Sequence, residues 1–218
     1  MLVRSMSSLR HVSTALVVAL SALMLGCPHQ EPPVDAAPPP RFDAGPPDPL
    51  FQGDITLDDV AVMAIDPSTL RAGASPCRAP LLARVTRVVD GDTMHVEGVS
   101  EPTGDLDIRF IGINAPEIAH GSGTVAECYG DAAHTFTMQL EGHLVWLTFD
   151  AECLDVYGRT LAYVTYGSGT SQMWERQLLR RGFARILSIS PNTSYRPLFE
   201  SDVTIAMSER AGLWSACP

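Results

Sequence analysis

The chain has 218 residues and carries 15 basic side chains against 25 Asp plus Glu, which gives a formal net charge of −10. Every one of the basic residues is Arg, because the sequence contains no Lys. This balance excludes a protein that holds polyanions by general basicity, since neutralising phosphates requires clustered cations. Any binding to a polyanion must come from a local group of Arg side chains together with a metal ion.

The N-terminal end has the layout of an export signal. Arg4 and Arg10 give a basic start, an apolar run covers residues 15–25, and Gly26 and Cys27 follow. Such a run is typical of a secretory signal and too short to span a bilayer. A Cys directly after a small residue resembles the lipobox of bacterial lipoproteins. We therefore predict a signal peptide over residues 1–27, lipidation of Cys27, and an exported protein whose lipid anchors it in the cell envelope, with a soluble secreted protein as the alternative.

The next region is poor in large apolar side chains. Residues 28–52 are rich in Pro, Ala and Asp, and a segment of this composition cannot bury enough surface to fold. Residues 53–75 are harder to interpret, because the run 60–65 fits either a strand or a helical turn. We predict a disordered tether over residues 28–75, followed by one domain of ordinary length over residues 76–218.

Cysteine usage agrees with export. Without Cys27 the chain keeps an even number of cysteines, which are Cys77, Cys128, Cys153 and Cys217. In an oxidising compartment they predict two disulfides, and the sequence leaves all three pairings open. No close pair of cysteines has zinc-site spacing, and the six histidines are equally scattered, so we predict no metal role for either.

The predicted strands fall in two groups. Residues 82–89 and 94–96 predict two strands joined through a turn, and 105–113 is the clearest strand, with Leu106, Ile108 and Phe110 on one face. Pro116 ends this strand, since proline cannot donate to a sheet ladder. Residues 143–149 and 160–166 are apolar on both faces and predict central strands.

Three helices are predicted between and after these strands. They cover residues 127–140, residues 172–181 before Gly182, and residues 196–210 before Gly212. The order of elements excludes an all-β sandwich and lacks the alternation of a doubly wound sheet. The prediction is a mainly β member of the α+β class, a small barrel with three packed helices.

Three motifs supply the parts of a site for phosphoryl transfer. Such a site needs oxygen ligands for a hard cation, cationic side chains for the charge that builds on phosphate, and a carboxylate that orients or deprotonates water. The motifs are Asp90-Gly91-Asp92-Thr93, then Ile108-Arg109-Phe110-Ile111-Gly112-Ile113-Asn114-Ala115-Pro116-Glu117, and Asp155-Val156-Tyr157-Gly158-Arg159. Each also has a purely structural interpretation, as a hairpin turn, a surface ion pair of Arg109, or a turn before a strand.

In this order and spacing, and with the later Leu161-Ala162-Tyr163 and Gly212-Leu213-Trp214-Ser215, the motifs resemble the staphylococcal nuclease (thermonuclease) family over about residues 83–215. The resemblance implies a five-stranded OB-fold barrel with three helices. It also implies a monomeric Ca²⁺-dependent endonuclease that hydrolyses DNA and RNA, prefers single strands, and breaks the 5′ P–O bond to leave 3′-phosphates.

The resemblance also implies roles for individual residues. The Ca²⁺ ligands would be Asp92, Asn114 and the backbone carbonyl of Ala115. The residues that carry out cleavage would be Arg109, Arg159 and Glu117, with Tyr157 contacting the substrate. Planar Arg side chains match phosphate oxygens, and Ca²⁺ accepts carboxylate, amide and carbonyl oxygens, so the chemistry agrees with these roles. For the disulfides, the family fold suggests the pairs Cys128–Cys153 and Cys77–Cys217.

Two residues depart from the family pattern. Asn114 stands where the family usually has a second aspartate, so we predict weaker Ca²⁺ binding, because affinity follows ligand charge. Ser188 stands in place of a tyrosine that packs on the nucleotide, so we predict weaker base stacking and low sequence preference.

Other functions stay open at this stage. The Arg residues at 176, 180, 181 and 185 could bind nucleic acid, but such a run is more typical of a solvated helix face. The main alternative to an enzyme is a catalytically weakened OB-fold module that binds nucleic acid or an envelope partner, and a third is an enzyme acting on a smaller phosphodiester. The joint presence of Asp92, Arg109, Glu117 and Arg159 favours catalysis.

Overall fold

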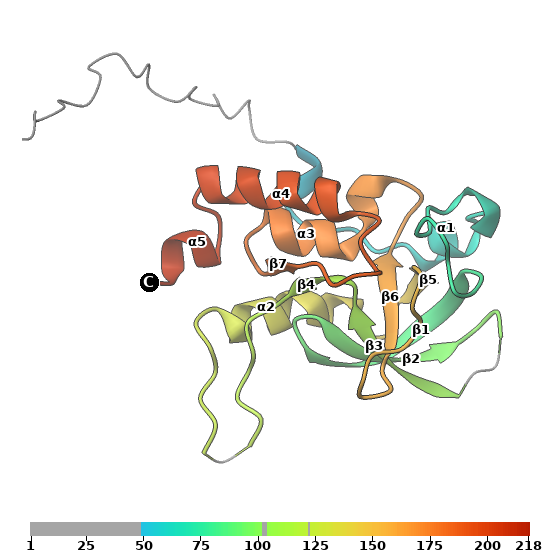
Figure 1. The fold of residues 1–218 in the computed structure, drawn as a ribbon, viewed down its shortest axis with the longest axis horizontal. Coiled ribbons are helices and arrows are strands. Elements are labelled where there is room, and N and C mark those ends of the chain that lie inside the picture. Colours follow the sequence, from blue (N-terminus) through green and yellow to red (C-terminus); the bar gives the residue numbers. More distant parts are fainter. Residues whose placement is uncertain (1–48, 102–103, 122) are drawn as a thin grey trace, which may run out of the picture. The chain divides into compact units, whose positions relative to one another are not determined.

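The computed structural model describes residues 49–101, 104–121 and 123–218 (Figure 1). The predicted signal peptide, the lipidation site Cys27 and the first part of the predicted tether lie outside these residues. Among the described residues, no helix has the length and apolar character needed to cross a membrane.

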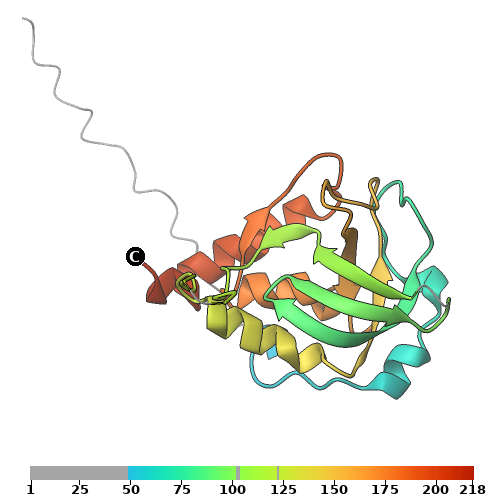
Figure 2. The same cartoon turned by 90° about the horizontal axis from the view of Figure 1, so that it is seen from below.

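A barrel forms the centre of the domain (Figure 2). Within the described ranges five strands close it in the order β1-β2-β3-β6-β5, as the OB-fold prediction expects. Neighbouring strands are antiparallel except β3 and β6, which run parallel. The barrel strands are β1 (Leu81–Asp90), β2 (Thr93–Gly98), β3 (Asp105–Phe110), β5 (Leu144–Thr148) and β6 (Thr160–Thr165).

The strand pattern of the sequence explains the core. Ile108 and Phe110 are buried on the predicted inner face of β3, and every residue of β5 is buried, as its continuous apolar run predicts. Beyond the barrel, the predicted strand 105–113 splits into β3 and β4 (Gly112–Asn114). The short β4 pairs with β7 (Arg185–Leu187) in a separate two-stranded sheet.

The helices that follow β4, which are α2 to α5, pack to one side of the barrel, and α1 (Asp59–Met63) lies elsewhere, beside β5 (Figures 1 and 2). The first of the predicted helices, α2 (Gly130–Thr137), begins three residues later than predicted, because Tyr129 has a left-handed backbone (φ 75°) that a right-handed helix cannot include. Ahead of it, Glu127 N–H donates to the carbonyl of Glu117 at 2.8 Å. It continues as the 3₁₀ turn η3 (Met138–Leu140). The others are α3 (Trp174–Arg180), which pairs with α4 (Arg196–Ser208), and the short α5 (Leu213–Ala216); the 3₁₀ turn η4 (Thr170–Gln172) precedes α3.

The prediction of a disordered tether is wrong for residues 49–75, which we call the strap. It contains η1 (Pro49–Phe51), α1 (Asp59–Met63) and η2 (Pro67–Thr69). Phe51 is only 7% exposed and lies between two guanidinium groups, 4.9 Å from that of Arg176 and 5.2 Å from that of Arg180. Val62 is buried, and its carbonyl accepts a hydrogen bond from Trp146 Nε1 at 2.9 Å. Two buried apolar residues therefore anchor the strap to the domain.

The same contacts change the interpretation of the Arg residues on α3. Arg176 donates to both carboxylate oxygens of Asp202, at 2.7 and 2.9 Å, and Arg180 forms an ion pair with Glu209 at 3.3 Å. Arg181 Nη1 donates to the Gly53 carbonyl at 2.9 Å. These side chains hold α4 and the strap, so neither the solvated-face nor the nucleic-acid interpretation applies to them.

The disulfides pair differently from the family-based prediction. The bonds are Cys77–Cys153 and Cys128–Cys217, in place of Cys128–Cys153 and Cys77–Cys217. The path of the chain after the strap explains the first bond: Cys77 N–H donates to the carbonyl of Asp150 at 2.7 Å, which places Cys77 beside the segment after β5. The C-terminal turn then lies beside the start of α2, where Cys217 meets Cys128.

Candidate active site

The turn between β1 and β2 places two carboxylates next to each other. Asp90 Oδ1 accepts a hydrogen bond from Asp92 N–H at 3.0 Å, which closes a tight turn around Gly91. A Cβ at Gly91 would collide with the side chain of Ala115, so only glycine lets the turn pack this closely against the segment after β4. Both carboxylates are buried.

Asp92 is fixed from three directions. Its Oδ2 accepts the backbone N–H of Ala115 at 2.6 Å and lies 3.1 Å from Arg109 Nη2, while its Oδ1 accepts the hydroxyl of Thr93 at 3.1 Å. Burial raises the pKa of the Asp92 carboxyl; Arg109 opposes the rise, Asp90 adds to it, and the result is a pKa of about 7. Two adjacent buried carboxyls of this kind favour a bound cation or a proton.

Arg109 lies near the C-terminal end of β3. Its register partner on the neighbouring strand is Thr93, the first residue of β2. Its Nη1 donates to the carbonyls of Phe110 and Ile113, at 2.8 and 3.0 Å, and its Nη2 donates to Asn114 Oδ1 at 3.0 Å. With the Asp92 ion pair, these contacts fix the plane of the guanidinium group before any substrate binds.

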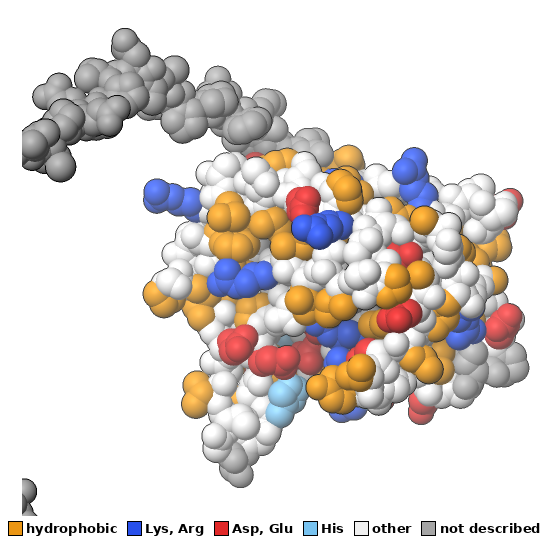
Figure 3. Space-filling view, viewed as in Figure 1, with side chains coloured by type: hydrophobic (Ala, Val, Ile, Leu, Met, Phe, Trp, Pro, Cys, Tyr) orange, Lys and Arg blue, Asp and Glu red, His pale blue; other side chains and the backbone are white. Residues whose placement is uncertain are grey.

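Glu117 lies in the loop between β4 and α2. Its backbone is fixed, because Glu117 N–H donates to Glu127 Oε2 at 3.2 Å and the Glu117 carbonyl accepts Glu127 N–H. Its carboxylate is exposed and lies 3.6 Å from His120 Nε2. Ligand atoms of Asp90, Glu117 and His120 all lie within 4.8 Å of one another. In the space-filling view, acidic side chains and a histidine gather at the base of this loop, next to arginines (Figure 3).

Arg159 is brought beside Arg109 by the parallel pairing of β3 and β6. Arg109 is in register with Leu161, so Arg159, directly before β6, lies two residues along the ladder from Arg109, and both line one groove. Arg159 Nε donates to Asp155 Oδ2 at 2.7 Å, and Asp155 Oδ1 accepts the backbone N–H groups of Tyr157 and Arg159. Burial alone would raise the pKa of Asp155, but these hydrogen bonds outweigh it and lower the pKa, so the carboxylate stays charged.

A groove connects the two arginines. It encloses about 270 Å³ and is lined by Arg109, Arg159 and Tyr157, together with apolar side chains such as Leu154, Leu187 and Ile189. Tyr157 is 82% exposed, and its ring lies 5.6 Å from the Arg159 guanidinium. The groove therefore combines two cationic groups with an apolar wall, which suits a phosphate that carries a base or another apolar group.

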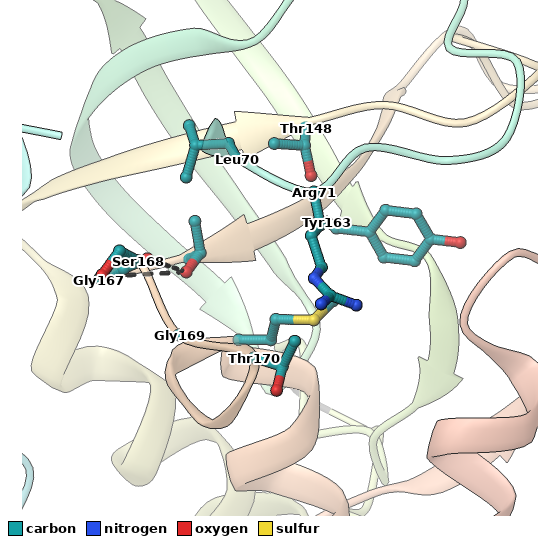
Figure 4. A pocket seen from close by; sticks show the side chains of 10 residues that line it. Leu70, Arg71, Thr148, Tyr163, Gly167, Ser168, Gly169 and Thr170 are labelled. Atoms are coloured by element: carbon teal, nitrogen blue, oxygen red, sulfur yellow. Dashed lines mark hydrogen bonds between the residues drawn. The ribbon is translucent and has the colours of Figure 1, made fainter. Parts of the chain in front are cut away.

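A second hollow lies between Leu70 and Arg71 of the strap and residues 167–170 (Figure 4). It encloses only about 20 Å³, room for about one water molecule. No carboxylate or imidazole lines it within the described residues. Neither its size nor its chemistry suits phosphoryl transfer, so the groove beside Arg109 is the better candidate.

The structure thus brings the predicted residues to one end of the barrel, in two groups. Direct contacts connect Asp92, Arg109, Asn114 and Ala115. The second group, Arg159 and Tyr157, lines the same groove as Arg109. Glu117 adjoins Asp90, the carboxylate next to Asp92. Sequence reasoning gave no role to His120 or to Asp155; the four-residue spacing from Asp155 to Arg159 was an available signal for their ion pair.

The donor set fits a hard divalent cation. It offers the carboxylates of Asp90 and Asp92, the amide oxygen of Asn114 and the carbonyl of Ala115, and oxygen ligands of these kinds are what Ca²⁺ accepts. Asn114 is a neutral amide and supplies no charge to a cation, and its Oδ1 also accepts a hydrogen bond from Arg109.

Comparisons with known proteins agree with this arrangement. The family model described as staphylococcal nuclease homologue matches residues 107–216 of this chain. The chain is 37% identical over 131 residues to the thermonuclease of Staphylococcus intermedius, covering 60% of this chain and 74% of that protein. It is 34% identical over 133 residues to the thermonuclease of Staphylococcus hyicus, covering 61% and 75%. It is also 32% identical over 139 residues to endonuclease YhcR of Bacillus subtilis, covering 60% of this chain and 11% of that protein.

Proposed function

Because the chain belongs to the staphylococcal nuclease family, we propose that it is a Ca²⁺-dependent endonuclease that hydrolyses phosphodiester bonds of DNA and RNA. The observation that carries the proposal is the position of Arg109 and Arg159 along one groove, with the carboxylates of Asp90, Asp92 and Glu117 at the same end of the barrel. The thermonucleases and the endonuclease among its relatives support the reaction class.

The side chains divide the reaction between them. Arg109 and Arg159 hold the non-bridging phosphate oxygens and balance the charge that grows as the phosphorus becomes five-coordinate. Glu117 takes a proton from the attacking water while the new P–O bond forms and the 5′ P–O bond breaks. The leaving 5′ oxygen takes up a proton from solvent water, so the products are a 3′-phosphate and a 5′-hydroxyl, and Glu117 returns its own proton to solvent.

Calcium would be held by Asp92, Asn114 and the Ala115 carbonyl, where it supplies positive charge beside the scissile phosphate. Asp90 fixes the turn that carries Asp92. Because one of the three ligands is a neutral amide, we expect a high Ca²⁺ requirement. Calorimetry that found tight, submicromolar binding would contradict this expectation.

The proposal extends to the substrate, the site of action and the oligomeric state. Ser188, between the groove residues Leu187 and Ile189, offers no ring for base stacking, so the groove would accept single-stranded nucleic acid with little base preference. Residues 1–27 and Cys27 support export with a lipid anchor, which would place a monomeric nuclease at the cell envelope.

The test is cleavage of denatured DNA by the purified protein in Ca²⁺ and in chelator. Glu117→Gln and Arg159→Ala should each lower kcat by about 10²–10³-fold, since each removes a group that acts mainly in the transition state. Arg196→Ala and Glu200→Gln, which break an exposed ion pair on α4, are matched controls and should keep the parent rate.

The same assay separates the alternatives. A binding module would retain DNA in a Ca²⁺-dependent way without cleaving it, and an enzyme for smaller substrates would hydrolyse a dinucleotide but not the polymer. Cleavage that persists in chelator and in both variants would come from a contaminant and would remove the support for a nuclease.

A further inference from the structure

His120 has no part in the proposed reaction, yet its imidazole lies at the edge of the candidate site. It comes from the loop after β4, and its Nε2 is 3.6 Å from Glu117 Oε2. A carboxylate oxygen of Asp90 completes a group whose ligand atoms lie within 4.8 Å of one another. Asp90 adjoins the calcium ligand Asp92, whereas Glu117 and His120 lie outside the set of Asp92, Asn114 and Ala115 assigned to calcium.

The spacing suits a shared metal ion better than a direct hydrogen bond. At 3.6 Å, the separation of His120 Nε2 and Glu117 Oε2 is too long for a good hydrogen bond. Two ligands bound to one zinc ion at about 2.0–2.1 Å, in tetrahedral geometry, lie about 3.3–3.5 Å apart. The observed pair is within a small side-chain movement of that value.

One member of the group is rigid and the other two can adjust. Asp90 is 9% exposed and is held at the end of β1 by the Asp92 N–H, which uses one carboxylate oxygen. No cationic side chain forms an ion pair with Asp90 in the described part of the chain, and its charged neighbour is the carboxyl of Asp92. Glu117 and His120 have half-exposed side chains on a loop whose base is fixed by Glu127 and the Cys128–Cys217 disulfide. The remaining distance can therefore close without moving the barrel.

The ligand types decide which ion fits. An imidazole with two carboxylates suits zinc and similar transition metal ions, whereas Ca²⁺ takes oxygen ligands. Asp92 is not a member of this group, because the ligand atoms that lie within 4.8 Å of one another belong to Asp90, Glu117 and His120.

We propose that Asp90, Glu117 and His120 form a second cation site that binds Zn²⁺ or a similar transition metal ion and thereby inhibits the enzyme. Inhibition follows because a carboxylate bound to zinc no longer accepts a proton from water. The binding of metal stands on the geometry alone, and the inhibition rests on the proposed nuclease function.

Metal binding is tested without substrate, using Co²⁺ as a spectroscopic probe on protein that carries no histidine tag. The parent protein should give visible Co²⁺ absorption bands that Zn²⁺ removes by displacement. His120→Ala should weaken Co²⁺ binding by about tenfold or more, as loss of one of three ligands implies. His134→Ala on α2 is the matched control and should bind Co²⁺ like the parent. Equal Co²⁺ affinity in the parent and in His120→Ala would overturn the site.

Inhibition is tested with Ca²⁺-activated cleavage of denatured DNA over a Zn²⁺ titration, each variant being normalised to its own zinc-free rate. The zinc concentration for half inhibition should rise about tenfold in His120→Ala and not in His134→Ala, in proportion to the lost affinity. Cobalt binding through His120 without any effect of zinc on cleavage would overturn the inhibitory role. Loss of cleavage in every preparation would count against the nuclease proposal, while the Co²⁺ titration would still decide the metal site.

Discussion

Glu175 on α3 should make the stability of this domain fall as the pH rises. Its side chain is fully buried, and although its Oε1 accepts the backbone N–H of Val164 at 2.9 Å, its Oε2 has no partner within the described residues. Burial raises the pKa of this carboxyl from 4.5 to about 8, against the hydrogen bonds that lower it. The folded protein therefore keeps Glu175 protonated at pH values where the unfolded chain has released the proton.

The direction and size of the effect follow from this difference. Below pH 4.5 the carboxyl is protonated in both the folded and the unfolded state, so its ionisation does not change the free energy of unfolding. Between pH 4.5 and 8 only the folded state retains the proton, so the free energy of unfolding decreases by about 1.4 kcal/mol per pH unit. Above about pH 8 the carboxyl is ionised in both states, so the decrease in the free energy of unfolding stays constant. Glu175→Gln keeps the acceptor for Val164 and cannot ionise, so it removes this pH dependence.

We expect the stability of Glu175→Gln relative to the parent to increase by about 3 kcal/mol between about pH 5 and about pH 8. Urea unfolding followed by tryptophan fluorescence, in chelator so that metal binding does not contribute, measures this difference. Glu97→Gln, at an exposed position of β2, is the control and should show no trend with pH. A constant difference between Glu175→Gln and the parent across this range would refute the reasoning, as would a variant that is less stable at the higher pH.

Three further outcomes are expected. Asn114→Asp should tighten Ca²⁺ binding by about tenfold in calorimetry, because it adds a charged ligand; an unchanged Kd would remove Asn114 from the cation site. Ser188→Tyr should lower KM for single-stranded DNA about threefold with kcat unchanged, since stacking adds binding that is equal in ground and transition states, and a changed kcat with constant KM would contradict this. Phe51→Ala should lower the free energy of unfolding by about 3 kcal/mol, against less than 1 kcal/mol for the exposed Leu50→Ala, and equal losses would show that the strap is not anchored through Phe51.

The barrel was predictable because its signals are local. The alternation that places Ile108 and Phe110 inward also places Arg109 on the other face, and one strand period is enough to see it. The motif around Asp92 is equally local, since Asp90 caps the same turn. Sequence therefore indicated both the fold and the side chains that meet in direct contact at the end of the barrel.

The features that were missed depend on contacts between distant parts of the chain. The strap was predicted as part of the tether because it follows a segment rich in Pro and Asp, whereas Phe51 and Val62 fill sites on the domain that no sequence window reveals. The course of the strap then decides the partner of Cys77, so the pairing of the disulfides could not be deduced before that course was known. His120 gave no signal either, because the carboxylate of Asp90 that it approaches lies on another element.

The parallel ladder between β3 and β6 also determines the stage of folding at which the candidate active site forms. It joins two segments that are far apart in the sequence, and pairing at such a separation has a large entropic cost that only a nearly complete barrel can offset. Arg109 and Arg159 become neighbours in that same step. In a nascent or partly folded chain the two arginines are not yet close enough to bind one phosphate together. The protein therefore becomes able to cleave its substrate only when it reaches the native state.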